Sequence, residues 1–147
     1  CLCGILCFCG VKRIMKSPDM KYVILRCEDQ APYSERAATL LAGAKTVTRR
    51  TWKESHARLF HAGDMVAAWD KSPRAGGHQI ATIRLTADPV WTSAVPDDAD
   101  WEAEGFAWMS DRGFTLFNKE RPEEGWRIWC LGFAHYWGVR FKMVSIP

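Results

Sequence analysis

A short segment of the chain concentrates positive charge. Residues 45–58 hold five cationic side chains against the single acid Glu54, a local charge of +4; the cations are Lys45, Arg49, Arg50, Lys53 and Arg58. A basic strand of this kind can neutralise several phosphates, and each such contact makes binding depend on salt. For Trp52, two interpretations stay open: a ring that stacks on an unpaired base, or a plug for the hydrophobic core. The segment predicts an RNA or single-stranded nucleic-acid surface formed by Arg49, Arg50, Trp52 and Lys53.

The same segment places a hydroxyl three residues after an amine. A Thr hydroxyl such as that of Thr48 becomes a nucleophile only when a base removes its proton. Lys45 could be that base if the cations beside it and partial burial disfavoured its ammonium form. Positions 45 and 48 point to opposite faces of a regular strand because their separation is odd. We therefore expect Lys45 to precede the strand, or a bulge to intervene, if both are to reach one site.

Other chemistry-bearing residues match no known template. His56 and His61 lack the spacing of H-E-x-x-H, and His78 and His135 are isolated. Four cysteines form two C-x-C pairs near the start of the chain, at Cys1, Cys3, Cys7 and Cys9; structural zinc sites usually use C-x₂₋₄-C. The absence of G-x-S-x-G, phosphate-loop and dinucleotide patterns argues against serine hydrolases, NTPases and dehydrogenases. We expect a protein without a metal or cofactor.

Four segments carry a family resemblance. Gly43–Arg50 reads G-x-K-x-x-T-x-R, Gly63–Asp64 follows it as a turn, Trp101–Phe106 ends in A-E-G-F, and Val139–Ile146 alternates like a closing strand. In this order the segments resemble the ASCH family of small domains with a PUA-like β-barrel. The resemblance extends over roughly residues 20–146. It implies an α+β fold, and a nucleoside or RNA as the partner.

The resemblance also implies an activity. Small bacterial members are amidohydrolases that remove the acetyl group from N4-acetylcytidine with a Lys, a Thr and a Glu. By motif position these fall on Lys45, Thr48 and Glu104, and the final Arg of the motif falls on Arg50. A carboxylate near Lys45 would favour its ammonium form, so Glu104 either orients the amine or passes a proton to the leaving nitrogen. The alternative function is nucleic-acid binding, with or without the ribonuclease activity reported for the family.

The sequence pattern predicts the elements that must position these residues. Strands are expected at 20–26, 45–52, 65–69, 78–85 and 139–146, where β-branched residues or period-two alternation dominate. Helices are expected at 35–42, at 101–108 after the acidic cap 97–100, and from Pro122 through the aromatic stripe to Trp137. About five strands and two or three helices without a βαβ rhythm favour a mixed or antiparallel half-barrel or barrel over a Rossmann sheet.

Composition bounds the remaining expectations. The 147 residues are 48% hydrophobic and carry a net charge of +3, which is typical of a folded single domain. Residues 1–19 read as an unstructured or non-native leader, and 20–147 as the domain. The apolar run at the start is about half the ~20 residues that a membrane helix needs. Cys27 and Cys130 are too few for a disulfide scaffold, so we expect a cytoplasmic protein with no membrane association and no obligate protein partner.

Overall fold

The computed structural model describes residues 21–24, 35–115, 121–131 and 135–147. The strands in these ranges are β1 (Tyr22–Ile24), β2 (Val47–Arg50), β3 (Met65–Trp69), β4 (Gln79–Leu85), β5 (Val90–Thr92) and β6 (Tyr136–Ser145). The helices are α1 (Glu35–Leu41), α2 (Glu54–Ala57), α3 (Asp98–Ala103), α4 (Phe106–Asp111) and α5 (Pro122–Leu131), with a 3₁₀ turn at Pro73–Ala75. The expected leader, residues 1–19, lies outside the described residues.

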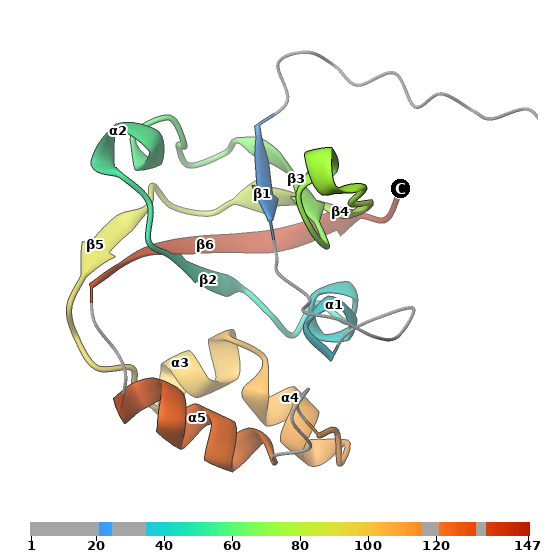
Figure 1. The fold of residues 1–147 in the computed structure, drawn as a ribbon, viewed down its shortest axis with the longest axis vertical. Helices are drawn as coiled ribbons and strands as arrows, with labels where there is room; N and C mark the ends of the chain where they lie inside the picture. The colour runs from blue at the N-terminus through green and yellow to red at the C-terminus, as the bar shows by residue number, and fades with distance from the viewer. Residues whose placement is uncertain (1–20, 25–34, 116–120, 132–134) are drawn as a thin grey trace, which may run out of the picture.

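The strands form one curled mixed sheet in the order β1-β3-β4-β6-β2, and β5 also pairs with β6. Only β1 and β3 are parallel among the described pairs. The ten-residue β6 joins the sheet together, because its first half pairs with β2 and β5 and its second half with β4. Figure 1 shows β6 running the length of the sheet. The curl gives a half-barrel, which confirms the expected α+β class.

The hydrophobic core lies on one face of this sheet. Val66, Ile83, Leu85, Val139 and Phe141 are at most 2% exposed and belong to one cluster of buried side chains. They come from β3, β4 and β6 at alternate positions, as a strand with one buried face requires. Leu40 of α1 and Phe60, which follows α2, complete the cluster from outside the sheet.

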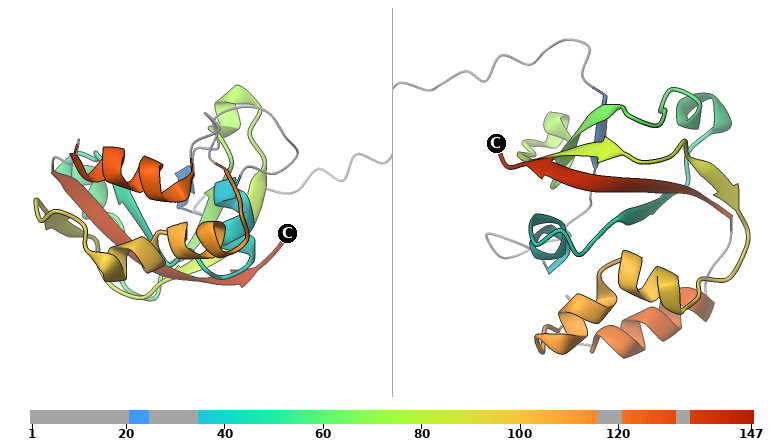
Figure 2. Two further views of the ribbon diagram at one scale, coloured as in Figure 1. Left: turned by 90° about the horizontal axis from the view of Figure 1, so that it is seen from below. Right: turned by 180° about the vertical axis from the view of Figure 1, so that it is seen from behind.

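Helices α3, α4 and α5 form a separate group beside β2 (Figures 1 and 2). Helix α3 begins with a capping box, in which the Asp97 carboxylate accepts from the Asp100 N–H and the Asp100 carboxylate accepts from the Asp97 N–H. Gly105 separates α3 from α4 with a φ of +88°, a left-handed conformation that favours glycine. A side chain at 105 would also collide with Thr39 of α1, since a Cβ there would lie 2.9 Å from the Thr39 Cβ.

The structure differs from the sequence prediction in four elements. The expected helix 101–108 is two helices broken at Gly105, and β5 and α2 occupy segments that gave no helix or strand signal. The expected helix from Pro122 to Trp137 ends at Leu131 in the described part of the chain, and Trp137 lies in β6 instead. Trp137 pairs with Arg50 on one side and Trp91 on the other. These long-range pairings decide its conformation against its helical spacing.

Candidate functional site

The loop between α1 and β2 places Lys45. Gly43 has a φ of +72°, and the Lys45 N–H donates to the Thr39 carbonyl at 3.1 Å, so the chain turns back against α1 before the strand begins. Lys45 therefore precedes β2, as expected if it were to join a site. Lys45 is only 6% exposed. The long side chain is directed into the protein, where an ammonium needs a charged or polar partner.

Glu104 supplies that partner from the end of α3. The Lys45 Nζ forms an ion pair with Glu104 Oε2 and also donates to the Glu104 carbonyl at 3.3 Å. A backbone bond of 2.8 Å from Thr46 N–H to the Ala103 carbonyl joins the same two segments. Glu104 is 8% exposed. Two residues 59 positions apart in the sequence thus meet in a buried ion pair at the junction of sheet and helices.

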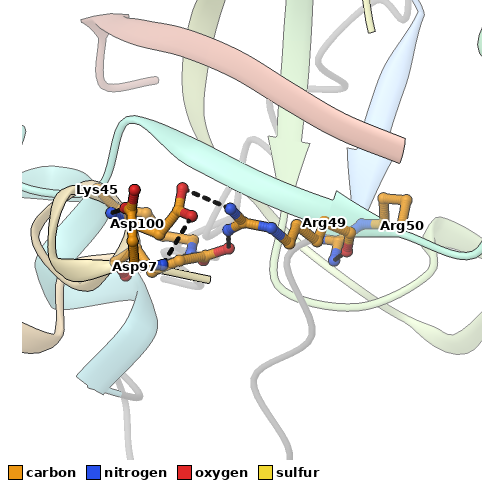
Figure 3. A network of polar contacts seen from close by, with 6 residues as sticks. Lys45, Arg49, Arg50, Asp97 and Asp100 are labelled. Carbon is orange, nitrogen blue, oxygen red and sulfur yellow. Dashed lines mark hydrogen bonds and ion pairs between the residues drawn. The ribbon is translucent and has the colours of Figure 1, made fainter. Parts of the chain in front are cut away.

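Arg49 extends the pair into a network (Figure 3). Its Nη1 lies 2.6 Å from Glu104 Oε1, and its Nη2 lies 2.5 Å from Asp100 Oδ1. Figure 3 shows Arg49 directed toward Asp100 and away from Arg50. The guanidinium carbon lies 5.3 Å from the ring centre of Trp129 in α5, within the range of a cation–π contact. Arg49 therefore binds the helical group to the sheet, and it does not lie on an open basic surface.

The network balances two cations with two carboxylates. The side chains of Lys45, Arg49 and Glu104 are 7–8% exposed, and that of Asp100 is 18% exposed. Burial costs each charge its hydration, and a buried pair is retained only where hydrogen bonds replace that hydration. Within the described residues, Arg49 Nε is the one buried side-chain nitrogen or oxygen without a hydrogen-bond partner. Chemically, the network offers an ammonium donor beside a carboxylate acceptor in a site shielded from water.

Thr48 lies next to this network but on the other face of β2. It pairs with Val139, and directly paired residues of antiparallel strands share a face. Val139 belongs to the main core, and Thr48 is 3% exposed. The described residues show no hydrogen bond from Thr48 to Lys45 or Glu104. The structure brings together Lys45 and Glu104 of the three expected catalytic residues and leaves Thr48 on the core side.

The remaining expected binding residues lie toward the other end of β2. Arg50 pairs with Trp137, and its Nη1 donates to the Arg49 carbonyl at 2.8 Å. Trp52 stacks on Phe60 with 4.7 Å between ring centres and packs against the core while still half-buried. Lys53 is exposed. Trp52 therefore packs on the core, as one interpretation expects, and part of its ring also reaches the surface.

Trp52 reaches the surface in an aromatic groove. The groove is lined by Trp52, Glu54, Trp91 and Trp137 and has a volume of about 290 Å³. The sequence pattern did not identify Trp91 and Trp137 as groove residues, because Trp91 lay in none of the expected strands and helices and Trp137 was expected in a helix. Asp100 was expected only as a cap residue. The pairing of β5 with β6, which joins Trp91 to Trp137, gives no signal in the local pattern of either strand.

The described part of the chain contains neither a cluster of metal ligands nor a membrane-spanning helix. No group of three or more His, Cys, Asp or Glu side chains there could hold a metal ion. No helix among residues 21–24, 35–115, 121–131 and 135–147 has the length and apolar character needed to cross a membrane.

Comparison with known proteins gives one structural likeness. The fold is similar to the crystal structure of protein EF3133 from Enterococcus faecalis V583, of family DUF984. The two chains share 17% sequence identity and superpose with a TM-score of 0.51, over 87% of this chain and 82% of that one. No family model matches the sequence, and no curated protein matches it. The likeness therefore extends to the fold alone.

Proposed function

We propose that the chain is an amidohydrolase that removes the acyl group from an N4-acylated cytidine or a related modified nucleoside. The proposal rests on the resemblance of Gly43–Arg50 to the ASCH motif. The observation that favours it is the buried ion pair between Lys45 and Glu104. The motif alone predicts that these two residues share a site, although 59 positions separate them.

The reaction consumes one water and breaks the bond between the acyl carbon and the exocyclic nitrogen, giving cytidine and a carboxylic acid. In an ion pair Lys45 is an ammonium, so its suitable role is to donate to the oxyanion or to the leaving nitrogen. Glu104 is then the carboxylate that accepts the proton of the nucleophile. Contact with Glu104 disfavours the alternative role of Lys45 as the base that activates Thr48.

Thr48 enters the proposal through the resemblance. As a nucleophile, its oxygen would form an ester with the acyl carbon while the amine leaves with a proton, and water would then release the acid. Its place on the core face makes this role testable separately from that of Lys45. If Thr48 is the nucleophile, Thr48→Ser retains activity and Thr48→Val abolishes it.

The test is the release of cytidine from N4-acetylcytidine, followed by chromatography. Wild-type protein is expected to release cytidine, and Lys45→Gln is expected to slow release by roughly 10²–10⁴-fold, the usual contribution of a positioned proton donor. Lys71→Gln is the matched control, because Lys71 is an exposed lysine that follows β3, outside both the ion-pair network and the aromatic groove. Circular dichroism and a melting curve show whether each variant is folded. Absence of turnover by the folded wild type, with this and other acylated nucleosides, would exclude the proposal.

A second candidate function is single-stranded nucleic-acid binding. The observation that favours it is the aromatic groove beside the exposed Lys53 and next to Arg50. Arg49 is assigned to the ion-pair network in this proposal, since its guanidinium is occupied by Glu104 and Asp100. Affinity for a single strand is expected to fall steeply as salt is added. Equal affinity at low and high salt would contradict this function.

A further inference from the structure

We propose that the aromatic groove holds one unpaired base of a single-stranded nucleic acid, and that Glu54 favours a base with an exocyclic amine. The inference deepens the second candidate function and does not depend on hydrolysis. It assigns a ligand to Trp91, Trp137 and Glu54, which the motif does not include.

Three strands and a loop bring the tryptophans together. Trp91 of β5 pairs directly with Trp137 of β6, and their ring centres lie 5.4 Å apart. Trp52 follows β2, and its carbonyl accepts a 3.1 Å hydrogen bond from Trp137 Nε1. Figure 1 shows β5, the start of β6 and the segment from β2 to α2 meeting at the same end of the sheet. The groove is therefore fixed by strand pairing.

The rings are held by other aromatic side chains. Trp52 stacks on Phe60 with an interplanar angle of 17°, and His56 contacts it edge-on at 4.9 Å. Trp91 stacks on His135 with an interplanar angle of 9°. Trp91 nevertheless remains 51% exposed. A flat ligand that stacks in the groove therefore meets preordered rings, and this lowers the entropy that binding costs.

The charges near the groove favour a base over a cationic ligand. Lys53 follows Trp52 and is exposed, so its ammonium suits a phosphate beside a bound base. Three tryptophans and a carboxylate also suit an alkylammonium group. Here, however, Arg58 pairs with Glu54 and neutralises it. An ammonium ligand would meet an excess of positive charge.

Glu54 supplies the selectivity. Both hydrogen bonds from Arg58 end on the same carboxylate oxygen, Oε1. Oε2 therefore has capacity to accept, and the exocyclic amine of cytosine is a donor that a Glu carboxylate recognises. Uracil presents a carbonyl oxygen at that position, so the carboxylate would disfavour it. We expect cytosine oligonucleotides to bind more tightly than uracil oligonucleotides.

The groove is separate from the buried ion-pair network. Lys45 precedes β2 and Trp52 follows it, and the four residues of that strand span roughly 13 Å. The base in the groove is thus not the base whose amide would be cleaved beside Lys45. Variants at the groove and at the network should separate the two functions.

The experiment measures fluorescence anisotropy of labelled single strands about ten nucleotides long, a length within the usual range of such sites. Wild-type protein is titrated into cytosine and uracil RNA, cytosine DNA and an RNA duplex. Trp91→Ala is expected to weaken single-strand binding by roughly 5- to 150-fold, the effect of losing one base–aromatic stack. Trp91→Phe should recover most of the affinity. Glu54→Gln should reduce the preference for cytosine over uracil by about fivefold.

Trp108→Ala is the matched control, because Trp108 stacks on Phe114 in the helical group and outside the groove. Trp108→Ala should bind single strands as tightly as the wild type does. If the chain is a hydrolase, Trp91→Ala should still release cytidine from N4-acetylcytidine. Equal affinity of wild type and Trp91→Ala would overturn the inference. So would duplex binding as tight as single-strand binding, or displacement of the strand by tetramethylammonium. Lys45→Gln should lose hydrolysis and keep strand binding, which separates a failure of the groove from a failure of the hydrolase.

Discussion

Replacing Glu104 by glutamine removes the carboxylate that Lys45 and Arg49 both contact. The substitution keeps the size of the side chain and leaves Arg49 its second partner, Asp100. Lys45 retains the 3.3 Å bond to the Glu104 carbonyl but loses its ion pair while its side chain is 7% exposed. Removing one partner of a buried pair costs about 3–5 kcal/mol. The remaining contacts place the expected loss at the lower end, about 3 kcal/mol.

Urea unfolding measures this loss. With a slope of about 2 kcal/mol per molar urea, the midpoint should fall by about 1.5 M. Glu54→Gln is the matched control, because Glu54 also pairs with an arginine, Arg58, but the two side chains are 62% and 74% exposed. An exposed pair of this spacing contributes about 0.3–0.5 kcal/mol. If the two substitutions cost the same free energy, the network does not bind the helical group to the sheet.

Three further predictions concern the scaffold. Gly105→Ala should lower the free energy of unfolding by roughly 2–4 kcal/mol, because it places a side chain at a φ of +88° and against Thr39. Gly113→Ala is the control: at a φ of +67° with open space around it, it should cost only the strain of the left-handed backbone. Equal losses of stability in urea for the two variants would refute the clash with Thr39. Asp97→Ala should lower stability by about 1 kcal/mol, because it removes the N-cap of α3. Asp98→Ala is the control, since it leaves the capping bond in place. An unchanged melting curve for Asp97→Ala would argue against the capping role of Asp97. The Lys21 ammonium, 2.7 Å away, and to a smaller extent the His61 N–H hold the pKa of Asp64 below its usual value of 3.8. The contribution of the ionised Asp64 carboxylate to stability is therefore present above pH 3.8 and is lost as the pH falls below it. Acid unfolding of Asp64→Asn should lack this part of the pH dependence, and curves parallel to those of the wild type would contradict the prediction.

Local pattern predicted the elements whose residues are set by near neighbours. β3 occupies the expected residues 65–69, and α1 and β4 agree with the prediction to within one residue. Asp97 was expected among the cap residues of a helix and is the N-cap of α3. The pattern placed Trp137 wrongly, because sheet pairing with Arg50 and Trp91 decides its conformation.

The candidate site likewise combines features that the sequence predicted with features that it did not. Motif order predicted that Lys45 and Glu104 share a site, and the loop after Gly43 lets Lys45 turn away from the strand toward α3. The pairing of Arg49 with Asp100 could not be predicted, since it depends on how α3 packs beside β2. The groove escaped prediction for the same reason: Trp91 and Trp137 meet only across β5 and β6.

The most direct test of the proposed function is the rate at which cytidine appears from N4-acetylcytidine with wild-type protein and with folded Lys45→Gln protein. We expect release by the wild type and a rate at least about 100-fold lower in the variant. Release at the rate of buffer alone by the wild type, or equal rates in the two proteins, would contradict a hydrolytic role for the Lys45–Glu104 pair.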